Sequence, residues 1–444
     1  MHGTISSGRT IHRGEPGFEE AVMGTSFNAR DPGCRPDVIV QANSVEHVIA
    51  AVHLARQRDL KITICSGGHS WTQNHIRDGA VLIDMARLNR IEIDAGKMTA
   101  AVGPGCLCGT LNDALAKEKL FFPVAHAYTV GLGGFLLQGG FGWNSRAMGL
   151  ACENVIGFDA VLADGSLVHV SEKENADLFW AARGAGPGFF AAIVRFHLKL
   201  HRRPRFMGLK FQIFRKEYLD YVFTWADSIG PSISPKVEFQ IVMNPKAMLI
   251  GAPGFEVLAP VIADSWRDAR EATAFLRDSP IRAKASFTSP LLPISLSTMM
   301  KTGEKTLFLP NTHWYTDNMW ISGGVERILP GLRAIADSQP PAPSHALWLN
   351  WNPVRRPDMA FSVEDRTYLA LYGGLRNPQD ISAHGDWAAR NMKALEPYSS
   401  GIQLADENLA NRPARFLSDG NMARMERIRA RHDPEGRFPA WRAV

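Results

Sequence analysis

The sequence lacks the features that would place it in several common protein classes. Its five cysteines are an odd number without repeating spacing, so they do not form the pattern of a disulfide framework. Cys106 and Cys108 flank a single residue, but no histidine or second cysteine pair completes a ligand set around them. We therefore predict no metal site. We interpret these two cysteines as small buried residues, with a reactive thiol as the alternative.

Long apolar runs and blocks of charge are missing as well. No segment reaches the length of a membrane span, and residues 1–10 are polar, so no secretory signal is visible. We expect a cytoplasmic protein without membrane contact. The net charge is +5, but lysine and arginine are scattered along the chain, which argues against a nucleic-acid partner.

Two widespread nucleotide-binding signatures are also missing. Residues 131–142 (GLGGFLLQGGFG) are rich in glycine, but Leu136 occupies the place of the third glycine in a GxGxxG motif. No GKS or GKT sequence is present either. A Rossmann site for NAD and a P-loop are therefore disfavoured.

The length and the hydrophobic pattern predict the fold class. A chain of 444 residues is too long for one compact core, and its composition shifts at residues 201–204 (HRRP), where we place a domain boundary. Apolar spacing predicts an α+β fold with short strands, followed by a second α+β region with an antiparallel sheet. The expected strands are residues 61–65, 80–84, 90–94, 99–102, 155–162, 167–170, 191–200, 237–242, 345–351 and 367–372. The expected helices are residues 45–58, 109–119, 177–182, 266–277, 387–395 and 420–431.

Two glycine-rich loops point to one large ligand. Residues 66–71 (SGGHSW) directly follow an expected strand, and the successive backbone N–H groups of such a turn can bind a pyrophosphate. Residues 131–142 contain six glycines, which allow backbone amides to approach a bulky ligand closely. Together the loops indicate a ligand that passes between them. The alternative for residues 131–142 is a tightly packed turn region.

Six motifs resemble one family of flavoproteins. The chain is similar to the berberine-bridge-enzyme-like oxidoreductases of the vanillyl-alcohol-oxidase superfamily, which carry a PCMH-type FAD-binding domain and include 6-hydroxy-D-nicotine oxidase. The motifs are SGGHSW (66–71), LIDMARLNRIEID (82–94), TVGLGGFLLQGGFGWNSRAMGL (129–150), VLADGSLVHVS (161–171), DLFWAARGAGPGFFAAIV (177–194) and HDPEGRF (432–438). The resemblance implies a two-lobed α+β fold, an FAD-binding domain plus a substrate domain whose antiparallel sheet is covered by helices. We expect residues 1–204 in the FAD-binding domain, 205–404 in the substrate domain, and 405–444 returning to the first.

The resemblance also implies how FAD is held. His69 stands where the family's histidine bonds to the 8α-methyl carbon of the flavin, and Ala127 replaces the cysteine of a second bond, so we predict a single covalent link. Val130 is small, which would give oxygen access to the ring. The expected cofactor-binding residues are Ser66, Gly67, Gly68, His69, Ser70, Thr129, Val130, Gly131, Gly134, Gly139, Gly140, Gly142, Val155 and Ile193.

The family's usual catalytic base is missing from this sequence. Its common positions align with Phe141, Leu371 and Gln403, and phenylalanine and leucine cannot accept a proton. We take four residues as catalytic candidates, with core packing as the alternative for each: Tyr128, Trp351, Tyr372 and Gln403. Tyr368, His345 and Asp406 are further candidates.

These expectations combine into a predicted reaction. A small organic substrate, aromatic or a natural product, would give a hydride to flavin N5, and O2 would reoxidise the flavin to yield H2O2. One alternative is a dehydrogenase that passes electrons to another acceptor. The other is a cyclising or binding scaffold with little redox activity, because fold alone does not determine function. The sequence does not predict the oligomeric state.

Overall fold

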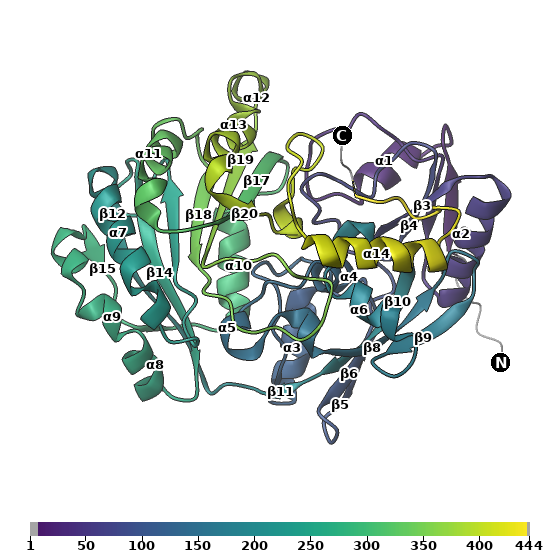
Figure 1. Ribbon diagram of the computed structural model, residues 1–444, viewed down its shortest axis with the longest axis horizontal. Helices are drawn as coiled ribbons and strands as arrows, with labels where there is room; N and C mark the ends of the chain where they lie inside the picture. Colours follow the sequence, from purple (N-terminus) through teal and green to yellow (C-terminus); the bar gives the residue numbers. More distant parts are fainter. Residues whose placement is uncertain (1–7, 442–444) are drawn as a thin grey trace.

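The computed structural model describes residues 8–441, which form two lobes side by side (Figure 1). The N-terminal part of the chain and the last long helix build one lobe, and the middle of the chain builds the other. Both lobes combine helices with largely antiparallel sheets, which confirms the predicted α+β class. The division into residues 1–204, 205–404 and 405–444 stays a prediction.

A four-stranded sheet in the first lobe carries the SGGHSW turn. Its order is β1-β2-β4-β3, and the pairs β2–β4 and β4–β3 are parallel. Val81, Leu82 and Ile83 in β4 are fully buried, as expected for a parallel strand covered on both faces. Strand β3 ends at Cys65, so the turn starts at the carboxyl end of a strand, where open parallel sheets bind their ligands. The strands are Arg9–His12 (β1), Val38–Gln41 (β2), Lys61–Cys65 (β3) and Ala80–Asp84 (β4).

A second, antiparallel sheet of the first lobe has the order β5-β6-β10-β8-β9. Helix α2 (Val45–Gln57) packs its buried face into the core that both sheets share. The helix begins at Ser44, whose side chain accepts a hydrogen bond from the amide of His47. The strands are Ile91–Asp94 (β5), Thr99–Val102 (β6), Val155–Val161 (β8), Leu167–Ser171 (β9) and Ala192–Lys199 (β10), and the short pair is Leu120–Phe121 (β7) with His201–Arg202 (β11).

The second lobe is built on one large antiparallel sheet, as predicted. Its order is β15-β12-β14-β13-β18-β19-β17-β20, and β16 pairs with β12. Four helices bury their apolar sides in one core with Leu369 and Leu371 of the sheet, namely Leu219–Ile229 (α7), Trp266–Ala272 (α8), Leu329–Asp337 (α11) and Trp387–Leu395 (α13). The strands are Phe206–Arg215 (β12), Gln240–Asn244 (β13), Gly254–Ala263 (β14), Phe287–Thr288 (β15), Leu292–Pro293 (β16), His313–Ile321 (β17), His345–Asn350 (β18), Thr367–Leu375 (β19) and Ser399–Gly401 (β20).

Each predicted helix and strand overlaps an element of the same type, and three regions differ from the prediction. The helix expected at residues 266–277 is broken in two, and residues 131–142, expected to be an open loop, contain a short helix. The strand expected at 237–242 begins only at Gln240, and Val237 makes an isolated bridge. The other helices are Phe18–Met23 (α1), Cys108–Lys117 (α3), Leu132–Leu137 (α4), Ser145–Met148 (α5), Ala176–Ala182 (α6), Ala274–Arg277 (α9), Leu296–Thr306 (α10), Pro378–His384 (α12) and Asp419–His432 (α14).

None of the helices within residues 8–441 combines the length and the apolar character that crossing a bilayer requires.

Candidate active site

A cavity of about 300 Å³ lies where the two lobes meet. Its first-lobe wall includes β3, the SGGHSW turn, residues 125–138 and residues 186–196. The opposite wall, called the second-lobe wall below, includes β18, β19, Phe308 and the segment from Gln403 to Asp406, which crosses the predicted boundary between residues 404 and 405. The cavity therefore has one wall made largely of glycine-rich backbone and a second made of side chains.

The two glycine-rich segments predicted to share a ligand are in direct contact. A Cβ atom on Gly67 would lie 2.4 Å from the backbone nitrogen of Gly131, and one on Gly131 would lie 2.6 Å from Cα of Gly67. Such distances are far below van der Waals contact, so only glycine allows the two backbones to approach this closely. The contact places the SGGHSW turn beside the start of α4, at the same end of the cavity.

The SGGHSW turn presents backbone donors to the cavity. Within residues 8–441, the amides of Gly67, His69 and Ser70 donate to no other protein group, although all three residues line the cavity. Successive unpaired N–H groups form an anion-binding concavity of the kind that holds phosphates. The donors and the glycine cradle therefore fit the pyrophosphate of a dinucleotide such as FAD.

His69 borders the cavity with one ring nitrogen already engaged. Its Nε2 lies 2.9 Å from Oγ1 of Thr129, and its ring stacks on Phe27 with centroids 4.7 Å apart. Burial in the protein lowers the pKa of His69 to about 4, so the imidazole is neutral at physiological pH. A neutral imidazole carries its N–H on one ring nitrogen and a lone pair on the other, so the direction of the bond to Thr129 determines which nitrogen is free.

A buried carboxylate forms the polar centre of the second-lobe wall. Oδ2 of Asp406 accepts hydrogen bonds from the hydroxyls of Tyr368 (2.5 Å) and Tyr372 (3.0 Å). Oδ1 accepts from the indole N–H of Trp71 at 2.7 Å. All four residues line the cavity. Burial raises the pKa of Asp406 above its ordinary value, and the three donors only partly oppose this.

The tyrosine hydroxyls remain donors to this carboxylate. Burial, together with the nearby Asp406, raises the pKa of both Tyr368 and Tyr372 well above the ordinary value. The ring of His345 stacks on the ring of Tyr372, with centroids 4.7 Å apart. Burial lowers the pKa of His345 to about 4, so this ring is uncharged at neutral pH.

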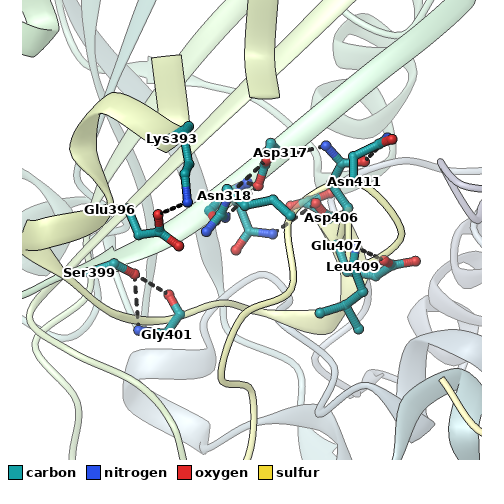
Figure 2. Close-up of polar contacts among 12 residues, drawn as sticks. Asp317, Asn318, Lys393, Glu396, Ser399, Gly401, Asp406, Glu407, Leu409 and Asn411 are labelled. Carbon is teal, nitrogen blue, oxygen red and sulfur yellow. Dashed lines mark hydrogen bonds and ion pairs between the residues drawn. The ribbon is translucent and has the colours of Figure 1, made fainter. Parts of the chain in front are cut away.

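The loop that carries Asp406 is anchored to strand β17 (Figure 2). The side chain of Asn318 donates to the carbonyls of Gln403 (3.0 Å) and Asp406 (2.8 Å), and its oxygen accepts from the amide of Gln403. Beside it, Asp317 forms a buried ion pair with Arg412. These bonds hold the backbone of the loop in place, so Asp406 is a preorganised group on an irregular segment.

The same loop also contacts the first lobe. The carboxylate of Glu407 accepts from the side chains of Thr72 and Asn74, the latter at 2.5 Å. Both residues follow the SGGHSW turn, so a single loop links the glycine-rich wall to the polar centre.

Most of the predicted FAD-binding residues line the cavity. They are Ser66, Gly67, Gly68, His69, Ser70, Val130, Gly131, Gly134 and Ile193. Thr129 lies just outside the lining and contacts His69 instead. The remaining predicted residues, Gly139, Gly140, Gly142 and Val155, do not line the cavity. A Cβ atom on Gly142 would lie 2.4 Å from the carbonyl oxygen of Val124. This glycine is therefore required by close backbone packing, which is the alternative role for residues 131–142.

The structure brings only two of the four predicted catalytic residues to the cavity. Tyr372 and Gln403 line it. The side chain of Gln403 donates to the carbonyl of Gln138 and accepts from the amide of Ala405. These bonds indicate that Gln403 stabilises the loop. The hydroxyl of Tyr128 instead bonds Asp113 (2.9 Å), and the indole of Trp351 bonds Glu364 (2.6 Å). We therefore assign no direct catalytic role to these last two residues.

Strand alternation explains why position 371 does not supply a base to the cavity. Leu371 belongs to the core under the helices, so it points away from the cavity, whereas Tyr368 and Tyr372 share the opposite face of β19. Phe141, the third position aligned with the family base, does line the cavity and stacks on Trp351 with centroids 4.2 Å apart. The only carboxylate among the cavity-lining residues is that of Asp406, which comes from the loop after the sheet.

Two polar features of the cavity have no sequence motif around them. Asp406 was one of several further candidates, and no local motif surrounds it. His126, whose ring lies on the lining, bonds Glu238 at 2.6 Å. Burial alone would lower the pKa of His126, but the Glu238 carboxylate outweighs it and the net shift is upward. Both features depend on contacts between distant segments.

One cysteine, Cys65, lines the cavity, and the described residues that could hold a metal ion lie outside it. Cys106 and Cys108 are buried, and burial raises the pKa of both to about 12, which disfavours a reactive thiolate. Among the described residues, one group has a geometry that could hold a metal ion, namely Asp159, His169 and His197. The carboxylate of Asp159 lies within hydrogen-bond distance of both imidazoles on the outer face of the sheet.

Comparison with known proteins identifies FAD-binding relatives, in agreement with the dinucleotide-binding wall of the cavity. The family described as an FAD binding domain matches residues 36–171. The FAD-linked oxidoreductase nodO of Hypoxylon pulicicidum is 33% identical over 429 residues, which cover 93% of this chain and 92% of that protein.

Two solved structures share the fold over nearly the whole chain. They are 6-hydroxy-D-nicotine oxidase from Arthrobacter nicotinovorans (TM-score 0.84, 21% identity, 97% of this chain and 96% of that chain) and BBE-like 1 of Physcomitrella patens (TM-score 0.85, 20% identity, 98% and 96%). Together with the glycine cradle and the full-length relative, they confirm the resemblance. The chain belongs to the FAD-linked oxidoreductases of the vanillyl-alcohol-oxidase superfamily, and it is an FAD-dependent enzyme.

Proposed function

We propose that the protein is an oxidase in which Asp406 is the catalytic base. The observation that carries this proposal is the buried carboxylate, which holds two tyrosine hydroxyls at the cavity surface opposite the glycine-rich wall. FAD, when bound, supplies the hydride acceptor at N5, and O2 takes the electrons to give H2O2. The protein binds the substrate, orients it and removes its proton.

The Asp406 cluster is suited to proton removal above the raised pKa of this carboxyl group. A carboxylate with a raised pKa is a stronger base than an ordinary one, and it is still ionised above that pKa. A substrate hydroxyl or amine beside Tyr372 can pass its proton to the tyrosine oxygen while the tyrosine proton moves to Oδ2 of Asp406. Trp71 holds the second carboxylate oxygen, so the base keeps a defined orientation.

The walls around this cluster favour an apolar substrate. Phe141, Phe308, Leu347 and Leu349 line the cavity beside the two tyrosines. Aromatic and aliphatic walls bind flat apolar molecules well, and a few placed polar groups set their orientation. These walls support an aromatic or natural-product substrate that carries one oxidisable hydroxyl or amine.

The first-lobe wall supports two finer features of the cofactor site. His69 borders the cavity as a neutral imidazole, which fits a single histidyl bond to the 8α-carbon of FAD, and Ala127 offers no thiol for a second bond. Val130 lines the same wall with a short side chain, which leaves space for O2.

The proposal is tested by separating the two half-reactions. The enzyme is mixed anaerobically with a panel of aromatic and alkaloid-like alcohols and amines, and bleaching of the oxidised flavin is recorded. Air is then admitted, and H2O2 is measured. We expect at least one substrate to reduce the flavin and to yield one peroxide per turnover.

Other outcomes contradict the oxidase in distinct ways. Fast reduction with slow reoxidation in air, rescued by a dye acceptor, would indicate a dehydrogenase. Bound flavin that no substrate reduces would favour the scaffold alternative. The pellet after acid precipitation tests the covalent bond, since its yellow colour should disappear in His69→Ala.

A further inference from the structure

Helix α10 comes from the middle of the chain, buries Leu296, Met299 and Met300 in the core of the first lobe, and contacts the segment next to His69. Ser297, Lys301 and Glu304 of α10 are spaced by four and three residues, so they share one helix face. Ser297 donates to Asp113, and the Lys301 ammonium lies 4.6 Å from the centre of the Tyr128 ring. These contacts dock α10 on α3 and on residues 128–129 of the first lobe.

Glu304 makes the contact nearest to the cofactor site. Its Oε1 accepts hydrogen bonds from both the backbone amide (2.7 Å) and the hydroxyl (2.5 Å) of Thr129. The same threonine oxygen lies 2.9 Å from Nε2 of His69. The three residues therefore form a chain of hydrogen bonds that runs from α10 through Thr129 to His69.

The direction of each bond follows from donor and acceptor chemistry. An ionised carboxylate only accepts, so Thr129 uses its single hydroxyl proton on Glu304. The Thr129 oxygen must then accept from His69, which requires the proton of the neutral imidazole to be on Nε2. Nδ1 is left as the atom with a free lone pair.

We propose that Thr129 and Glu304 are positioning residues that hold His69 as its Nε2–H tautomer and present Nδ1 to the 8α-carbon of FAD. This inference rests on the proposed covalent bond. It makes cofactor attachment depend on the docking of α10, because Glu304 of this helix meets Thr129 across 175 positions of sequence.

The chain of bonds also suits the charge that attachment creates. Forming the Nδ1–carbon bond replaces one methyl C–H bond. The methyl carbon would lose one proton and the alkylated imidazole its Nε2 proton; FAD, when bound, would accept the two electrons, and O2 would take them with both protons to give H2O2. While the bond forms, positive charge develops on the imidazole, and its Nε2–H points through Thr129 towards the Glu304 carboxylate. A hydrogen bond to a developing charge is stronger than one between neutral groups.

The test compares variants of the full-length protein produced with limiting riboflavin. After FAD is added, covalent attachment is followed by intact mass, and total bound FAD is measured separately. Losing a hydrogen bond to a charged group should slow attachment about 10-fold or more in Thr129→Val and Glu304→Ala. Thr129→Ser keeps the hydroxyl and should attach FAD at the wild-type rate. Lys305→Ala, on the exposed side of the same helix, is the matched control and should do the same.

The nitrogen chemical shifts of His69 in the protein without attached FAD provide a second readout. We expect a protonated Nε2 in the wild type and a mixture of tautomers in Thr129→Val. Attachment at the wild-type rate in Thr129→Val, or a protonated Nδ1 in the wild type, would overturn the positioning role. If the wild type binds FAD without any bond, the covalent proposal fails, and the tautomer measurement alone then decides between the expected and the overturning result.

Discussion

The two walls of the cavity are built on different principles. The first-lobe wall binds through backbone, with the turn at residues 66–71 and helix α4 brought into contact by Gly67 and Gly131. The second-lobe wall works through side chains, with Asp406, Tyr368 and Tyr372 converging from a loop and a strand. The first wall depends on short sequence motifs, and the second depends on register and on the docking of distant segments.

This difference separates binding from chemistry. Backbone donors and glycine contacts can hold the same cofactor in many relatives, because they do not depend on the substrate. The side-chain wall can change its base and its apolar surface without disturbing the cofactor. In this protein the aligned family positions are Phe141 and Leu371, and the carboxylate comes from the loop after β20.

The largest expected effect is on the second wall. Asp406→Asn keeps the shape of the side chain but removes the base, so the rate constant of flavin reduction should fall by about 10²–10⁴. FAD content should stay at the wild-type level, because the asparagine oxygen can still accept from Trp71 and the glycine-rich backbone is unchanged. Anaerobic stopped-flow measures the rate, and Asp264→Asn, an exposed carboxylate in the same lobe, is the matched control. An unchanged rate would remove Asp406 from the mechanism.

The pH profile sharpens the same comparison. The active form of Asp406 is the carboxylate, and burial raises its pKa above the ordinary 3.8. Flavin reduction should therefore be slow below this raised pKa and should increase as the pH rises through it. In Asp406→Asn the rate of flavin reduction should not show this increase with pH. If the rate of the wild type rises at the pH expected for an ordinary aspartate, the carboxylate is solvated rather than buried.

A change in the first wall should have an intermediate effect, and this effect should be on stability and FAD content rather than on the rate of flavin reduction. Gly67→Ala forces a Cβ atom to within 2.4 Å of the Gly131 backbone, and we expect a loss of about 1–3 kcal/mol in unfolding free energy together with lower FAD content. Denaturant unfolding and flavin absorbance measure both. The matched control is Gly420→Ala, because no atom lies within 4 Å of the added methyl group. Normal stability and flavin content in Gly67→Ala would show that the two glycine segments are not tightly apposed.

The smallest effect is expected for Tyr128→Phe. The hydroxyl of Tyr128 bonds Asp113 rather than facing the cavity, so its loss should cost about 0.5–1.5 kcal/mol of stability, the contribution of an ordinary hydrogen bond. The rate of flavin reduction by substrate should be unchanged. A large loss of rate with normal stability would place Tyr128 at the substrate after all.

Much of the fold was predictable because the signals are local. Residues 61–65, 80–84 and 387–395 have the predicted ends, since hydrophobic periodicity acts over a few neighbouring positions. The antiparallel sheet of the second lobe was also predicted correctly. The helix expected at residues 266–277 was only partly correct, because it breaks at Thr273, whose hydroxyl bonds the carbonyl of Ala269.

The sequence by itself determined the cofactor class and the wall that holds it. Backbone recognition of a dinucleotide needs contiguous residues, so residues 66–71 and 131–134 retain a readable signature. Only the tertiary structure decided which side chains face that wall. Leu371 and Tyr372 are neighbours on opposite faces of β19, and a shift of one residue in an alignment exchanges them. Asp406 meets Trp71 across 335 positions of sequence, and Glu304 meets Thr129 across 175, because distant segments of the chain dock. Such contacts leave no local pattern, since their geometry depends on packing rather than on neighbouring residues.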